Sequence, residues 1–149
     1  MNRKEACSYR GNKAQDLFKA TFPTAVKSDN DTDMYDHIDY FINQTGIDVK
    51  YNAHLETIWL ELKNVRGEKG WLQGKAEYIC WYIEEHHLFV FFKRTELLDF
   101  VQSNVTEYTT DKREYMKYYS RIGRDDLITK VKMSHIRHLL RLWSRCSKT

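Results

Sequence analysis

Three charged side chains that could act together occur in the stretch HIDYFINQTGIDVKYN, residues 37–52. Asp39 lies near the start of this stretch, and Asp48 and Lys50 lie two residues apart near its end. Side chains alternate between the two faces of a β-strand, so Asp48 and Lys50 point the same way if this segment is extended. A hairpin over these residues would bring both carboxylates and the amine together.

A second acid-x-lysine pair follows in the stretch WLELKNVRG, residues 59–67, where Glu61 and Lys63 are also two apart. One such pair in a charged sequence is close to what chance supplies, and its ordinary meaning is an exposed strand face. The sequence therefore leaves two candidate sites, of which at most one is an active site and the other a coincidence of spacing.

The residue types indicate metal-dependent chemistry. Carboxylates within a few ångströms of one another repel by an energy on the order of several kcal/mol, so a cluster of them needs a cation. Oxygen-only ligands favour Mg²⁺ or Mn²⁺ over zinc. Such an ion activates water and orients a phosphate, while a lysine positions the nucleophile or neutralises phosphate charge.

The elements that must position these residues predict a mixed α/β protein. An amphipathic helix is expected over residues 12–22 and ends at the only proline, Pro23, and the acidic residues 28–36 are expected to form a loop. Strands are expected over 37–43, 46–52, 57–65, 87–93 and 126–132. Further helices are expected over 71–83, over 96–104 with Thr95 as N-cap, and over 135–145 with Ser134 as N-cap.

Length and composition indicate one domain in a reducing compartment. A chain of 149 residues with 42% hydrophobic residues can bury one core. The three cysteines are odd in number and widely separated, which favours reduced thiols over a disulfide framework. The longest apolar run, residues 88–92, is much shorter than the roughly 20 residues of a membrane helix, and the N-terminus shows no signal-peptide pattern. We expect a cytoplasmic protein without membrane contact.

The order of these elements and the residues 37–52 resemble the PD-(D/E)xK nuclease superfamily. The stretch looks like the family's aspartate strand followed, after a short turn, by its acid-x-lysine strand, much as in phage junction-resolving endonucleases. The stretch WLELKNVRGEKGWLQGKAEYI, residues 59–79, is similar to small phage-type members. The resemblance implies a restriction-endonuclease-like αβββαβ core over about residues 12–104, with a basic strand-helix extension over about 105–149. Ile38 replaces the family's proline, and the helix-one glutamate has no counterpart beyond Gln15 and Asp16.

The resemblance implies a Mg²⁺- or Mn²⁺-dependent endonuclease that hydrolyses DNA, in a bacterial or phage-infected cell. Asp39, Asp48, Lys50 and Glu61 would be catalytic, with Asp39, Asp48 and Glu61 as metal ligands and Glu61 on the strand adjacent to the motif. In the alternative register Asp48 is the lone aspartate and Glu61 and Lys63 form the motif. Alternative contributors are Lys63, Asp16 and Gln73.

Charge is unevenly distributed along the chain. Residues 105–149 contain 11 basic and 5 acidic residues, whereas residues 1–104 contain 13 basic and 16 acidic residues. A basic half is typical of proteins that meet a polyanion. The candidate phosphate contacts are Arg66, Lys69, Lys75, Arg121, Arg124, Lys130, Lys132, Arg137 and Arg141.

Three further interpretations stay open. RNA could replace DNA as the substrate of the same site. A protein that keeps the nuclease fold but cuts nothing, such as a phage inhibitor of host defence, is the alternative from a different functional class. Many nucleases of this fold cut both strands as dimers, so a homodimer is a further hypothesis.

Overall fold

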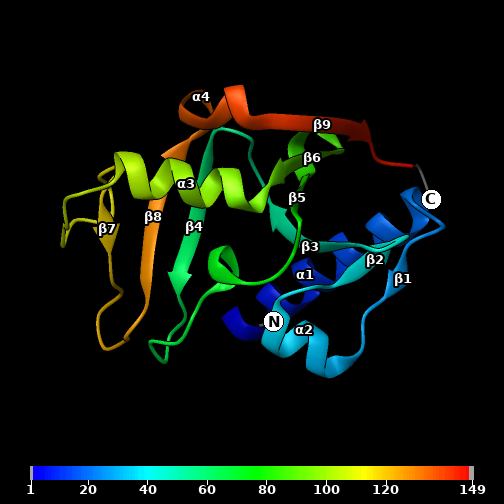
Figure 1. The fold of residues 1–149 in the computed structure, drawn as a ribbon, viewed down its shortest axis with the longest axis horizontal. Coiled ribbons are helices and arrows are strands. Elements are labelled where there is room, and N and C mark those ends of the chain that lie inside the picture. Colours follow the sequence, from blue (N-terminus) through cyan, green and yellow to red (C-terminus); the bar gives the residue numbers. More distant parts are fainter. Residues whose placement is uncertain (1, 148–149) are drawn as a thin grey trace.

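The computed structural model describes residues 2–147, and these residues form two β-sheets with helices against them (Figure 1). The larger sheet has six strands in the order β1-β2-β3-β5-β6-β9, and the smaller has three in the order β4-β8-β7. The strands are β1 (Val26–Lys27), β2 (Tyr40–Ile42), β3 (Thr45–Asn52), β4 (Thr57–Lys63), β5 (Tyr78–Ile83), β6 (Leu88–Lys93), β7 (Tyr118–Tyr119), β8 (Leu127–Lys132) and β9 (Leu140–Arg145).

The larger sheet is mixed, as the sequence predicts. Its only parallel pair within the described residues is β3 with β5, in the register Asp48 opposite Ile79 and Lys50 opposite Trp81. The β2-β3 hairpin is antiparallel, with Phe41 opposite Gly46. A mixed α/β architecture flanked by helices is therefore confirmed.

Helix α1 (Arg3–Thr21) covers one face of the larger sheet. It ends just before Pro23, as expected, but begins nine residues before the predicted start, at a capping box formed by Asn2 and Glu5. Its buried residues Ala14 and Phe18 belong to a cluster that includes alternate residues of β3 and the residues Phe89 and Phe91 of β6. This face of β3 is therefore closed to solvent, and the opposite face carries Asp48 and Lys50.

The main core lies on that opposite face, where the two sheets meet. It contains Leu60 from β4, Ile79 from β5 and Leu97 from helix α3 (Arg94–Asn104), all fully buried. Figure 1 shows α3 crossing β4 and β8. The predicted Thr95 N-cap is wrong, because α3 begins at Arg94 with Lys93 as its N-cap and has no side-chain cap.

The predicted helix over residues 71–83 is wrong. Only Trp71–Gln73 are helical, in the 3₁₀ turn η1, and the chain then enters strand β5. Five consecutive residues of β5, from Ile79 to Ile83, are buried because α1 covers one face and the main core the other. Such a continuous apolar run has no period of two, and periodicity alone cannot separate it from a buried helix.

The predicted helix over residues 135–145 is also wrong, and with it the strand-helix form of the C-terminal extension. The chain forms α4 (Met133–Ile136) and η3 (Arg137–Leu139), with Lys132 rather than Ser134 as the N-cap of α4. It continues as β9, which pairs antiparallel with β6. Pairing with the free edge of the larger sheet satisfies the backbone of β9 and outweighs its helical side-chain pattern.

Two smaller features complete the fold. Residues 28–36, expected as a loop, contain the short helix α2 (Asn30–Asp36), which Asp29 caps through the backbone N–H of Thr32. A single 3₁₀ turn, η2 (Glu84–His86), joins β5 to β6. None of the helices within residues 2–147 is long and apolar enough to cross a membrane.

Candidate functional site

Asp39 sits where β2 stops pairing with β3. The backbone N–H of Asp39 donates to the carbonyl of Ile47 at 2.9 Å. Its side-chain Oδ2 accepts from the backbone N–H of Val49 at 2.7 Å. The carboxylate thus takes the place of a strand partner at the free edge of β3, which explains why it is buried.

Asp48 lies on the neighbouring strand β3 and is 3% exposed. Its Oδ2 is buried without a hydrogen-bond partner. The ammonium of Lys50 is 3.2 Å from that oxygen, so the two form an ion pair, although the approach lacks hydrogen-bond geometry. The same ammonium lies 4.7 Å from the centre of the Trp71 ring, which fixes it over the site by a cation–π contact.

Three further side chains surround Asp39. Gln15 of α1 donates to Asp39 Oδ1 at 3.4 Å, and Lys27 of β1 lies 3.9 Å from the same oxygen. Lys27 also donates to Gln15 Oε1 at 3.0 Å and pairs with Asp33 of α2 at 3.1 Å. Lys27 and Asp33 were not predicted from the sequence, because only the packing of β1 and α2 brings them here. The acidic run 28–36 was the one available signal.

Both carboxyl groups resist ionisation. Burial raises the pKa of Asp39 to about 8, and the neighbouring charge of Asp48 adds to the effect, whereas the N–H of Val49 opposes it. Burial also raises the pKa of Asp48, against the lowering effect of Lys50. At neutral pH without a cation, the pair therefore favours one shared proton over two negative charges.

Glu61 is not on a strand adjacent to the motif, contrary to the prediction. Strand β4 belongs to the smaller sheet, and β3 lies between β2 and β5. A β-bulge separates Glu61 from Lys63, and Lys63 is exposed. Among the described residues neither of the two forms an ion pair. The structure therefore assembles Asp39, Asp48 and Lys50 as one cluster, and separates the Glu61 pair from it.

Glu61 nevertheless contacts the segment that supports Lys50. A Cβ added at Gly70 would come within 2.7 Å of Glu61 Cγ, so Gly70 packs directly on this side chain. The next residue, Trp71, carries the Lys50 ammonium on its ring. Gln73 also supports this segment: its side-chain amide donates to the carbonyl of Leu62 at 2.8 Å and so links η1 to β4.

The alternative position Asp16 is exposed on α1, and its neighbour Gln15 is the residue that reaches Asp39. Within residues 2–147, no three His, Cys, Asp or Glu side chains are grouped so that they could hold a metal ion. Two carboxylates are still a sufficient protein contribution for Mg²⁺, which keeps several waters and takes one or two carboxylates together with substrate phosphate. The Oδ2 of Asp48, which accepts no hydrogen bond, fits such a role.

The predicted phosphate contacts lie on different elements. Arg66, Lys69, Lys75, Arg124 and Arg137 are exposed, and Lys75 pairs with Asp36 at 3.4 Å. Arg121 donates to the buried Asp126 at 2.6 Å and so has a structural partner. Arg141 of β9 pairs with Glu96 of α3. Lys130 and Lys132 lie against aromatic rings of the smaller sheet.

Comparison with known proteins identifies no similar protein. No protein-family model matches the chain. Searches of curated proteins and of solved structures likewise find no significant match. The geometry of the site and the motif in residues 37–52 are therefore the indications of function that this chain offers.

Proposed function

We propose that this protein is a Mg²⁺- or Mn²⁺-dependent endonuclease that hydrolyses phosphodiester bonds of DNA. The observation that carries the proposal is the cluster of Asp39, Asp48 and Lys50, in which the buried Oδ2 of Asp48 has no hydrogen-bond donor. Burial raises the pKa of both carboxyl groups, and two buried carboxylates are costly in a protein without a cation, so a purely structural role explains them poorly.

Each residue of the cluster has a distinct task in this proposal. Asp39 and Asp48 would hold the metal ion, which when bound supplies Lewis acidity toward a phosphate oxygen and toward water. Lys50 would neutralise the non-bridging oxygens of the scissile phosphate, since its ammonium is partly exposed and Trp71 holds it in place. Gln15 and Lys27 would orient Asp39 through its Oδ1.

A cleavage assay tests the proposal. Supercoiled, linear, single-stranded and four-way-junction DNA, with an RNA of matched sequence, would be incubated with Mg²⁺, Mn²⁺ or EDTA. We expect metal-dependent cutting that Asp48→Asn and Lys50→Met abolish. The matched controls Asp16→Asn and Lys63→Met should retain it, because both side chains are exposed and outside the cluster.

The pattern of losses separates the alternatives. Loss in Lys63→Met with activity kept in Lys50→Met would move the motif to Glu61 and Lys63. Cutting of RNA alone would change the substrate and keep the site. No cutting of any substrate would refute the enzyme and favour the alternative, a nuclease-fold binding protein. That alternative is supported by the missing third carboxylate among residues 2–147.

A further inference from the structure

The outer face of the smaller sheet carries an aromatic and basic surface. Alternate residues of β4 are buried in the main core, so Thr57 and Trp59 point to the other side of this sheet. The register of the β4-β8 pair places Lys132 opposite Thr57 and Lys130 opposite Trp59. Both lysines therefore lie on the outer face, with Lys130 beside the Trp59 ring.

Two tyrosines extend this surface. Tyr119 of β7 lies opposite Ile128, and its ring centre is 6.2 Å from that of Trp59. Tyr115 comes from the segment before β7, and its hydroxyl is 2.9 Å from the hydroxyl of Thr57. We call this surface the Trp59 face and define it by Trp59, Tyr115, Tyr119, Lys130 and Lys132. All three rings are partly exposed.

The lysines of the Trp59 face lie against aromatic rings, and the carboxylate whose charge reaches Lys130, that of Asp111, is hydrogen-bonded to Arg113. Lys130 Nζ lies 4.4 Å from the Tyr115 ring centre and 5.7 Å from that of Trp59, and Lys132 Nζ lies 5.0 Å from the Tyr115 ring centre. Neither lysine forms an ion pair with any residue in the described part of the chain. Their charges are thus available to an external anion.

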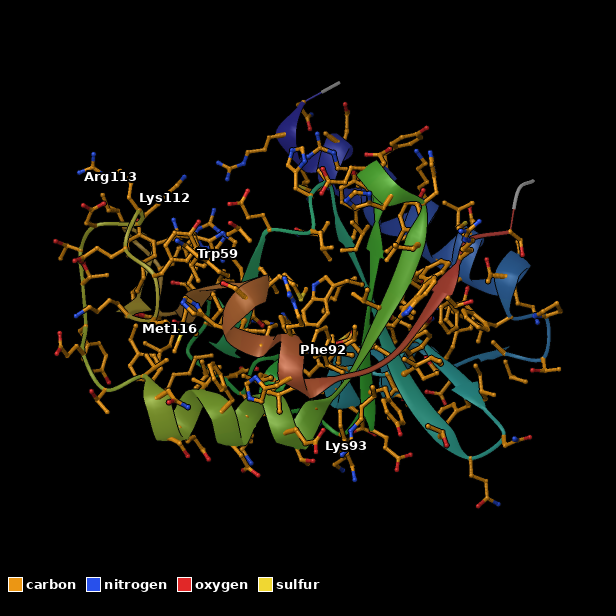
Figure 2. All side chains as sticks on the ribbon, turned by 90° about the horizontal axis from the view of Figure 1, so that it is seen from above. Trp59, Phe92, Lys93, Lys112, Arg113 and Met116 are labelled. Atoms are coloured by element: carbon orange, nitrogen blue, oxygen red, sulfur yellow. The ribbon has the colours of Figure 1, made fainter. Side chains whose placement is uncertain are left out.

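Two of the three carboxylates of the adjoining loop, residues 105–117, form ion pairs. Asp111 binds Arg113 at 3.0 Å, and Glu107 pairs with Lys117. Lys112 is exposed and forms no ion pair within residues 2–147. Figure 2 shows Lys112 and Arg113 at the end of the molecule that carries Trp59. The loop, residues 105–117, has three basic and three acidic residues, so it adds Lys112 as an exposed cation at this end of the molecule but no net charge.

We infer that the Trp59 face binds an unpaired strand of nucleic acid, with Trp59 and Tyr119 stacking on bases and Lys130 and Lys132 contacting phosphates. Partly exposed rings offer a stacking platform only to bases that are not already stacked in a duplex, and unpaired lysines beside them follow the backbone. Only the choice of nucleic acid over other polyanions rests on the proposed function. The inference adds a substrate class, a single strand or a junction with unpaired bases.

Binding in EDTA tests the inference apart from cleavage. Fluorescence anisotropy would follow a labelled oligo-dT strand, the matched duplex and labelled polyglutamate. We expect Trp59→Leu to weaken oligo-dT binding about 10-fold, the effect of one lost base stack. Lys130→Gln should reduce the slope of log K against log salt by about 0.7, the value for one phosphate contact on a single strand.

Two substitutions elsewhere are matched controls. Trp143→Leu removes a tryptophan that is 57% exposed on β9, and Lys93→Gln removes a lysine that Figure 2 shows far from Trp59. Neither should change binding. Lys130→Gln changes only a side chain on the outer face of the sheet. If Trp59→Leu unfolds, the salt dependence of oligo-dT binding by Lys130→Gln still tests the inference.

Three results would overturn the inference. The first is that the protein does not bind oligo-dT. The second is that Lys130→Gln and a folded Trp59→Leu both leave oligo-dT binding unchanged. The third is that polyglutamate binds as tightly as oligo-dT. Cleavage lost in Asp48→Asn together with normal binding in Trp59→Leu would leave the proposed function standing and refute only this surface. Weakened binding in Trp59→Leu, together with no cleavage of any substrate by the wild type, would support the surface and refute the nuclease.

Discussion

The buried pair Asp39 and Asp48 should make the protein lose stability as pH rises. A carboxyl group whose pKa is higher in the folded than in the unfolded chain binds more protons when folded, so the stability is fully present below the unfolded value of 3.8. It is lost as pH rises through the folded value, about 8 for Asp39. This direction is opposite to that of a salt-bridged carboxylate.

The size of this stability loss follows from the folded and unfolded pKa values of Asp39. At about 1.4 kcal/mol per pH unit, a rise from 3.8 to about 8 corresponds to a limit of roughly 6 kcal/mol for Asp39. Water entry and rearrangement around the ionised pair reduce such penalties. We therefore expect a loss of about 3 kcal/mol in the free energy of unfolding between pH 5 and pH 9 in EDTA.

Asp39→Asn is the informative substitution. The amide oxygen can still accept from the N–H of Val49, and the amide group adds no charge beside Asp48. Urea unfolding followed by tryptophan fluorescence should show less than half of the wild-type pH dependence. Asp16→Asn, an exposed aspartate of α1, should keep the full dependence.

Metal should reverse the effect in the same assay. Mg²⁺ at about 100 times its dissociation constant adds about 2.7 kcal/mol to the free energy of unfolding. At pH 8.5 this gain should appear in the wild type and be absent in Asp39→Asn. A wild-type stability that is flat from pH 5 to pH 9, or an Asp39→Asn variant with the same slope, would refute the account of the buried pair.

Further substitutions test the supporting structure. Gly70→Ala should cost about 1–3 kcal/mol in thermal unfolding, because its Cβ would lie 2.8 Å from the backbone oxygen of Glu61. Gly11→Ala, with nothing within 4 Å of the added Cβ in α1, should instead stabilise by about 0.5–1 kcal/mol, and a loss there would contradict the placement of α1. Asp126→Ala should cost about 2–3 kcal/mol, since this 1% exposed carboxylate accepts from both the backbone and the side chain of Arg121. An unchanged denaturant midpoint for Asp126→Ala would show that the hydrogen bonds between Asp126 and Arg121 do not stabilise the fold.

The hairpin that carries the cluster was predictable from sequence. The segments 40–42 and 45–52 have the turn residues and the alternation of a hairpin, and these are local properties of the chain. The shared face of Asp48 and Lys50 follows from that alternation alone. The first helix was predictable for the same reason, since its apolar spacing repeats with the helical period.

The position of Glu61, the expected third carboxylate, was not predictable from sequence, because strand order in a sheet is not a local property. Glu61 follows the hairpin in sequence, and a simple meander would place β4 beside β3. Instead β5 pairs with β3 in parallel, and β4 turns away to pair with β8. Burying apolar residues on both faces of β5 requires a position inside the larger sheet, and that position displaces β4.

The local structure around Asp39, Asp48 and Lys50 follows from nearby residues alone, because turn chemistry and strand alternation act over a few residues. The distant side chains that join them depend on how the elements pack. Gln15, Lys27 and Trp71 reach the cluster through the packing of α1, β1 and η1. Strand β9 also depends on distant contacts: residues 135–145 have a helical side-chain pattern, but residues 140–145 pair as a strand with the otherwise free edge of β6. Long-range burial and hydrogen-bond satisfaction outweigh local propensity at these places, and no short stretch of sequence records them.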